Sequence, residues 1–102
     1  MRVEVLTIEG CPNGAAAARH LEAALTAEGR AASVELRLVC TAAEAATSAF
    51  GGSPTITIDG VDLFPEGGSV DGLACRVYAT PAGLAGTPSV DQIRAAIRVL
   101  DD

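Results

Sequence analysis

The chain has 102 residues, enough for one domain around a single hydrophobic core, and we expect residues 1–102 to form that domain. Hydrophobic residues make up 49% of the sequence but aromatic residues only 3%, so the core must consist of Ala, Val, Leu and Ile. The net charge of −6 argues against a nucleic-acid partner. No apolar run reaches the roughly 18 residues that span a bilayer, and the N-terminus lacks a signal-peptide pattern. We therefore expect a cytoplasmic protein with no membrane partner.

The first forty residues predict two strands joined by a helix. Residues 3–8 are apolar on both faces, as in a central strand. The Ala-rich segment 12–28 has helical spacing, with Gly29 as its C-terminal stop. Residues 33–39 alternate, which predicts a half-exposed edge strand whose apolar face consists of Val34, Leu36 and Leu38. Because a helix joins the two strands, they should be parallel neighbours.

The middle of the chain predicts a short helix and then a hairpin. Residues 41–44 form a capping box, which opens a helix to about Phe50. Asp59-Gly60 is the strongest signal for a two-residue hairpin turn, and it separates the β-rich runs 55–58 and 61–64. These two runs should pair antiparallel.

The last third predicts a loop and a helix. The Gly- and Pro-rich segment 65–88 lacks a clear period, and we expect a long loop with no more than one helical turn, of a kind that is more often functional than inert. Residues 89–92 form a second capping box before a helix whose apolar stripe consists of Ile93, Ala96, Ile97 and Leu100. The predicted order is β-α-β-α-β-β-α, an α/β fold with a four-stranded mixed sheet and flanking helices.

Three cysteines stand at wide spacing, which fits neither a secreted disulfide framework nor a zinc site, so we expect free thiols. Cys11 directly precedes a helix, where unpaired amides and the helix dipole stabilise a thiolate. The plainer alternative is a small buried hydrophobic residue. Cys40 is expected to be mainly structural. His20 lies too far along the helix to touch Cys11, and we expect it on a solvated helix face.

The element order, with a cysteine at the first helix start and a Ser-Pro pair opening the third strand, resembles the thioredoxin fold over nearly the whole chain. The segments Gly10-Cys11-Pro12-Asn13, Gly52-Ser53-Pro54-Thr55 and Ala74-Cys75-Arg76-Val77-Tyr78 are similar to signature segments of small bacterial thioredoxin-like proteins. Some of that group carry selenocysteine at the first position, and some are associated with alkylmercury lyases. Thioredoxins have a Cys-x-x-Cys motif, whereas this chain has Gly14 at its fourth position. Dithiol exchange within the motif is therefore excluded, and single-thiol chemistry is open.

The resemblance implies a cis Ser53-Pro54 bond beside Cys11, where the backbone offers an edge to an extended peptide or a small thiol. The plainer alternative is a proline that simply starts a strand. On this basis we expect substrate contacts from Pro12, Asn13, Ser53, Pro54, Thr55 and Arg76.

Cys75 is the second candidate catalytic residue. If its loop folds over the first helix, Cys75 could resolve a mixed disulfide or sulfenic acid on Cys11, with Arg76 favouring the thiolate. Alternatively, Cys11 and Cys75 could clasp a soft metal ion. In the plainest interpretation, Leu73, Cys75 and Val77 only plug the open end of the sheet.

The sequence therefore predicts a thiol-based redox protein in which Cys11 attacks a disulfide, peroxide or glutathionylated substrate. The activity would be that of a thiol-disulfide oxidoreductase or a thiol peroxidase, with a protein or small thiol as partner and no cofactor. The alternative is a soft-metal or organomercurial binding or transfer protein that uses Cys11 and Cys75. A third hypothesis is an interaction scaffold with inert cysteines.

Overall fold

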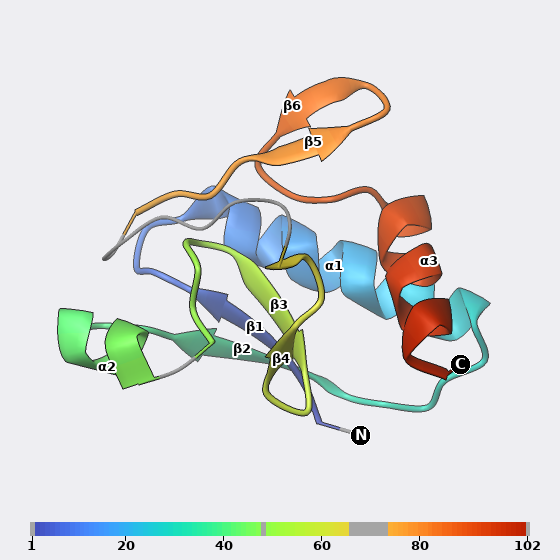
Figure 1. Cartoon of the computed structure of the whole chain (residues 1–102), viewed down its shortest axis with the longest axis horizontal. Coiled ribbons are helices and arrows are strands. Elements are labelled where there is room, and N and C mark those ends of the chain that lie inside the picture. Colours follow the sequence, from blue (N-terminus) through green and yellow to red (C-terminus); the bar gives the residue numbers. More distant parts are fainter. Residues whose placement is uncertain (1, 48, 66–73, 102) are drawn as a thin grey trace.

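The computed structural model describes residues 2–47, 49–65 and 74–101. Its main sheet has the strand order β2-β1-β3-β4 (Figure 1). These strands are β1 (Val3–Thr7), β2 (Val34–Leu38), β3 (Thr55–Ile58) and β4 (Val61–Asp62). β1 runs parallel to β2 and antiparallel to β3, which pairs antiparallel with β4. The predicted α/β class, the mixed four-stranded sheet and the central position of the first strand are confirmed.

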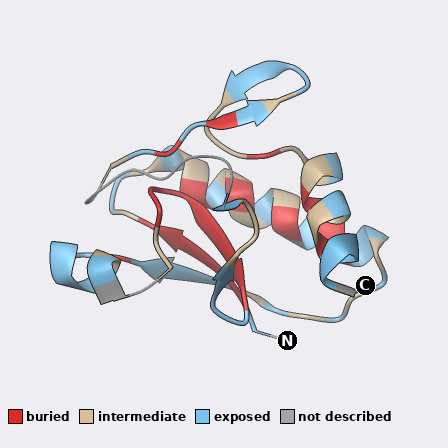
Figure 2. Cartoon of the chain, in the orientation of Figure 1, coloured by how far each residue is buried: buried red, intermediate tan, exposed pale blue. Residues whose placement is uncertain are grey.

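Two of the helices cover one face of this sheet and form the core with it (Figure 2). The helices are α1 (Pro12–Ala27), α2 (Ala42–Thr47) and α3 (Val90–Asp101). The core cluster joins β1 and β3 to α1 and α3 through Val3, Val5, Ile56, Ile58, Ala17, Leu21, Ala24, Leu25, Ile93 and Ile97. Fully burying one Val, Leu or Ile side chain contributes about 1.5 to 3 kcal/mol, so each such residue of the cluster stabilises the fold by about that amount. None of the helices in the described part of the chain is long and apolar enough to cross a membrane.

The helix ends follow the local signals. Pro12 stands in the first turn of α1, where its missing N–H removes no helical hydrogen bond. Gly29 has a φ of +71° just past the end of α1, a conformation that glycine adopts without strain. At α3, Ser89 N donates to Gln92 Oε1 at 2.9 Å and Gln92 N donates to Ser89 Oγ at 3.2 Å. Both predicted ends of the first helix and the second capping box are confirmed.

The predicted hairpin and short helix are also present, with different lengths. Asp59 and Gly60 have φ values of 52° and 80°, as a tight hairpin turn with two left-handed residues requires. β4 is only two residues long, half the predicted run. Glu44 N donates to Thr41 Oγ1 at 3.1 Å, which caps α2 as predicted. The predicted extension of this helix to Phe50 is wrong, because α2 ends at Thr47.

The edge strand β2 is less buried than its alternation indicates. Val34 packs against the core, but Leu36 and Leu38 are 53% and 51% exposed. Leu100, at the end of α3, is 50% exposed as well. The buried core cluster consists of residues from β1, β3, α1 and α3, and Val34 is the residue of β2 that packs against it. The predicted edge position of β2 is confirmed, whereas these three leucines of the predicted apolar faces are about half exposed.

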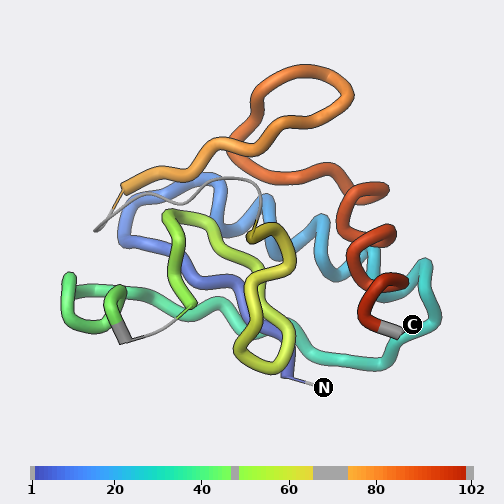
Figure 3. The backbone as a smooth tube through the Cα atoms, in the orientation of Figure 1, coloured from blue at the N-terminus to red at the C-terminus, as the bar shows by residue number. Residues whose placement is uncertain are grey.

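The expected long loop contains a second hairpin. β5 (Tyr78–Thr80) and β6 (Gly83–Ala85) pair antiparallel in a separate two-stranded sheet. Figure 3 shows this orange segment running out from the start of α1, turning, and returning toward α3. Strands of three residues are too short to show a period of two, which is why the sequence did not reveal them. Residues 66–73, including Leu73 of the predicted plug, lie outside the described residues.

Candidate functional site

Cys11 is the half-buried residue that caps the N-terminus of α1. Gly10, with a φ of +78°, turns the chain out of β1, and Cys11 N donates to Ile8 O at 3.2 Å. The thiol therefore lies where the amides of the first helical turn have no acceptor within the helix. The Cys11 side chain forms no capping hydrogen bond, and Gly14 N donates to Cys11 O at 3.4 Å. The predicted place of Cys11 at the helix start is confirmed.

Two buried hydroxyl groups approach the same sulfur from the sheet. Thr7 is the last residue of β1, and Ser53 lies two residues before β3. Their Oγ atoms are 2.8 Å apart, and Ile8 N donates to Ser53 Oγ at 3.1 Å. Each side chain is within hydrogen-bonding reach of the Cys11 sulfur. The Thr7 hydroxyl also lies 3.4 Å from Ile8 O, a second acceptor for its hydrogen.

The pKa of the Cys11 thiol reflects opposing effects. Burial raises this pKa, because it disfavours the charged thiolate. Hydrogen bonds from the Ser53 and Thr7 side chains and from the amides of Asn13 and Gly14 favour the thiolate and outweigh burial. The pKa of Cys11 therefore lies below its usual value, through donors that are all uncharged.

Thr7 was not among the residues that the sequence singled out. It reaches Ser53 only because β1 and β3 pair, which brings together residues 46 positions apart. A threonine at the end of a strand is an ordinary β residue, and no local signal marks it.

The Ser53-Pro54 peptide bond is cis, as the resemblance implied. The backbone of Ser53 is occupied on both sides: Ser53 N donates to Ala74 O at 2.8 Å, and Arg76 N donates to Ser53 O at 2.9 Å. These bonds make a parallel bridge between Ser53 and Cys75. The backbone edge that we expected to receive a peptide or a small thiol is thus filled by residues 74–76 of the chain itself.

Arg76 lies in the protein interior, with 1% of its surface exposed. Its Nη1 is 2.9 Å from Asp62 Oδ2, and its Nη2 donates to Phe64 O. The guanidinium lies over the ring of Tyr78, 4.9 Å from the ring centroid. We expected Arg76 to favour the thiolate or to contact substrate, but its charge is paired with Asp62 instead.

The remaining predicted substrate contacts differ in accessibility. Pro12 is exposed beside Cys11, and Asn13 is half-buried. Gly86 packs so closely on Asn13 that an added Cβ would lie 2.2 Å from Asn13 Nδ2. Thr55 is buried, and its hydroxyl bonds to the backbone of residues 51–52. Of these three side chains, Pro12 is the one on the surface.

Cys40 and Cys75 are exposed, and all three cysteines are free thiols, as predicted. His20 is half-buried instead of solvated: its Nδ1 lies 3.1 Å from Pro88 O and 3.3 Å from Thr87 Oγ1, just before α3. Among the residues that the structure describes, no three His, Cys, Asp or Glu side chains gather where they could hold a metal ion. The soft-metal site of two thiols stays a prediction.

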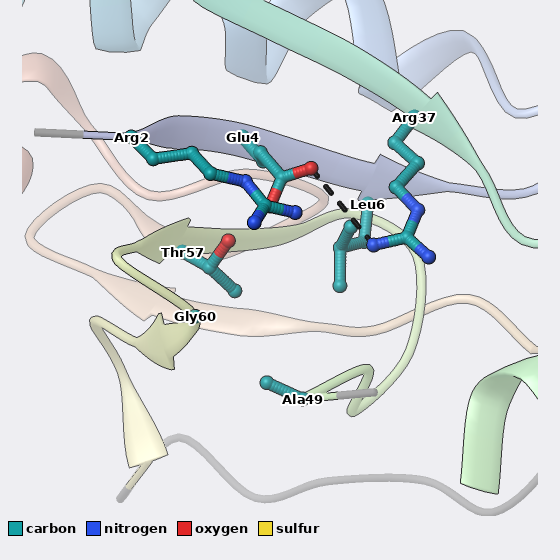
Figure 4. Close-up of a pocket in the computed structure, with 7 residues that line it drawn as sticks. All are labelled: Arg2, Glu4, Leu6, Arg37, Ala49, Thr57 and Gly60. Carbon is teal, nitrogen blue, oxygen red and sulfur yellow. Dashed lines mark ion pairs between the residues drawn. The ribbon is translucent and has the colours of Figure 1, made fainter. Parts of the chain in front are cut away.

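A separate polar pocket of about 250 Å³ lies on the face of the sheet opposite α1. Figure 4 shows Glu4 between Arg2 and Arg37, with Thr57 beside the same hollow. The Glu4 carboxylate is 3.2 Å from Arg2 Nη2 and 3.9 Å from Arg37 Nη1. The charge of Glu4 is thus paired within the protein, and no cysteine lines this pocket.

Comparison of the chain with models of known families, with curated proteins and with solved structures finds no match. Its function must therefore be argued from the geometry. The groups that meet are Cys11, the hydroxyls of Thr7 and Ser53, and the backbone of Cys75, all where β1 ends and β3 begins.

Proposed function

We propose that this protein is a thioredoxin-like thiol redox protein in which Cys11 is the nucleophile of thiol-disulfide exchange. The fold assignment is supported by the β1-α1-β2 unit, the antiparallel β3-β4 hairpin, the final helix α3, and the cis-proline next to the cysteine. One observation carries the activity: Cys11 lies at the N-terminus of α1 beside the buried Thr7 and Ser53 hydroxyls, and its pKa is lowered there. The thiolate is the nucleophilic form of cysteine, so these donors prepare the reactive species.

The reaction begins when the Cys11 thiolate attacks one sulfur of a substrate disulfide. A bond forms between the Cys11 sulfur and that sulfur, while the substrate S–S bond breaks and the leaving thiolate takes a proton from water. The products are a mixed disulfide on Cys11 and one released thiol. Before attack, the Ser53 and Thr7 hydroxyls and the helix amides hold the thiolate in place.

The occupied backbone of Ser53 favours small disulfides as substrates, including mixed disulfides of low-molecular-weight thiols. An extended peptide could pair with Ser53 only after residues 74–76 had left it, because both backbone groups are already bonded. Pro12 is the exposed side chain beside the thiol, and Asn13 is held under Gly86. A small disulfide needs no backbone pairing with Ser53, so we expect it to react with Cys11 while these contacts stay in place.

The test uses a Cys40→Ser/Cys75→Ser variant, in which Cys11 is the sole thiol. Its alkylation rate by iodoacetamide is measured against pH, with N-acetylcysteine as the reference thiol. We expect the inflection clearly below the value of about 8.5 of an unperturbed thiol. With 2-hydroxyethyl disulfide, we expect one mixed disulfide on Cys11 and one released thiol.

The control lacks all three cysteines and should show neither reaction. An inflection at or above that of N-acetylcysteine, or a Cys11 that forms no mixed disulfide, would contradict the proposed function.

A further inference from the structure

We infer that Cys75 is the resolving cysteine of this site, held opposite Ser53 by the buried Arg76 and positioned to form an internal disulfide with Cys11. The inference rests on the proposed function and extends it, because it supplies the second thiol that the Cys11-Pro12-Asn13-Gly14 segment lacks.

Ser53 is the residue that links the two cysteines. Its side chain faces Thr7 and the Cys11 sulfur, and its backbone forms the parallel bridge with Cys75. Directly paired residues in adjacent strands, about 4.8 Å apart, direct their side chains to the same face. The Cys75 side chain therefore points to the same face as the Ser53 side chain. Cys11 lies on that face. Cys75 is also exposed and free, so its sulfur is accessible.

The next residue along the chain confirms this alternation. Arg76 points away from Cys11, into the interior, where it bonds to Asp62 and Phe64 and lies over Tyr78. Successive side chains of an extended segment alternate between faces, so a buried Arg76 on one side places Cys75 on the other.

The segment that carries Cys75 is clamped at two points beyond the bridge. The Arg76–Asp62 ion pair ties it to β4, and the Tyr78 hydroxyl donates to Pro54 O at the start of β3. Burial of Tyr78 raises the pKa of its hydroxyl, which therefore stays protonated and keeps donating. These contacts give the 74–78 segment a fixed position beside the Ser53-Pro54 turn.

In the resolving step, each bond that forms is matched by a bond that breaks. In the mixed disulfide, Cys11 is bonded to a substrate sulfur, and the Cys75 thiolate attacks the Cys11 sulfur. The Cys11–Cys75 bond forms as the bond to the substrate breaks, and the substrate leaves as a thiolate that takes a proton from water. Over both steps, one substrate disulfide is reduced to two thiols, and the two cysteines are oxidised to one disulfide. The substrate disulfide is the oxidant.

The experiment treats reduced protein with oxidised glutathione and follows it by intact mass spectrometry, with the disulfide located by peptide mapping. In a Cys40→Ser variant, we expect an internal Cys11–Cys75 disulfide and two glutathione thiols released per chain. In Cys40→Ser/Cys75→Ser, we expect the reaction to stop at one glutathionyl adduct on Cys11 with one thiol released. The serine replacement is at an exposed position, so folding is not at risk.

The outcomes separate the two proposals. A glutathionyl adduct that persists equally in both variants would overturn the resolving role of Cys75 and leave the Cys11 reaction in place. A Cys11–Cys40 disulfide in the wild-type chain would also overturn it. If Cys11 forms no adduct in either variant, the proposed function itself fails.

Discussion

A Cβ atom added at Gly14 would lie 2.5 Å from the hydroxyl oxygen of Thr7, so the first turn of α1 packs directly on the end of β1. Gly14 stands where a Cys-x-x-Cys motif would have its second cysteine. A side chain at this position would push Thr7 away from Ser53, its partner at 2.8 Å. The hydroxyl pair beside Cys11 therefore leaves no room for a second cysteine at position 14.

The close packing of Gly14 predicts that Gly14→Ala destabilises the protein. Alanine is favoured over glycine in a helix by about 1 kcal/mol, but overpacking costs about 1 to 3 kcal/mol, and the contact at 2.5 Å places this site toward the high end. Unfolding in urea measures the net effect. In a Thr7→Ala background the overlap with the hydroxyl is gone, and Gly14→Ala should become much less costly. Equal costs in both backgrounds would mean that the Thr7 contact is not the cause.

Removal of the Ser53 hydroxyl is expected to raise the pKa of Cys11. Ser53→Ala removes a donor that favours the thiolate over the neutral thiol, so the inflection of the alkylation rate should move to higher pH. Below that inflection, the variant should react more slowly at every pH. Thr57→Val is the matched control, because its buried hydroxyl lies on the opposite face of the sheet. An inflection that is the same in Ser53→Ala and in the wild type would show that this hydroxyl does not hold the thiolate.

Neutralising Asp62 should release the segment that carries Cys75. Asp62→Asn leaves the buried charge of Arg76 without its counterion, which costs on the order of 3 kcal/mol. Amide hydrogen exchange should accelerate at Ser53 and Arg76, whose N–H groups form the bridge. Asp59→Asn makes the same chemical change in the same hairpin, at an exposed residue with a positive φ that asparagine tolerates. We expect no acceleration in that control, and equal effects of the two variants would contradict the role of the ion pair.

Acid should weaken the contact between α1 and α3 at Glu28. Hydrogen bonds from Arg98 and Arg94 lower the pKa of Glu28 from 4.5 to about 2. A carboxylate whose pKa is lowered by folding stabilises the folded state at any pH above its pKa in the unfolded chain. For Glu28 this contribution is lost as the pH falls from 4.5 toward 2. Glu28→Gln should remove this part of the pH dependence, as measured by urea unfolding across the acid range. An unchanged acid dependence in Glu28→Gln would refute the assignment.

Local features of the sequence determined where the main elements begin and end. The Asp59-Gly60 turn and the Gly29 stop depend on backbone conformations that few residue types adopt, so they could be predicted without knowledge of the fold. The same holds for the place of Cys11 at the start of α1, because Pro12 is preorganised for the first helical turn.

Tertiary structure alone decided what surrounds Cys11. Thr7 and Ser53 meet because β1 pairs with β3. The backbone of Ser53 is bonded to the segment that carries Cys75, and Arg76 forms an ion pair with Asp62. The exposure of Leu36 and Leu38 likewise depends on the packing of whole elements around the edge strand β2. Local signals act through the conformational preferences of a few neighbouring residues, whereas these contacts join residues from 14 to 46 positions apart, or depend on the packing of whole elements.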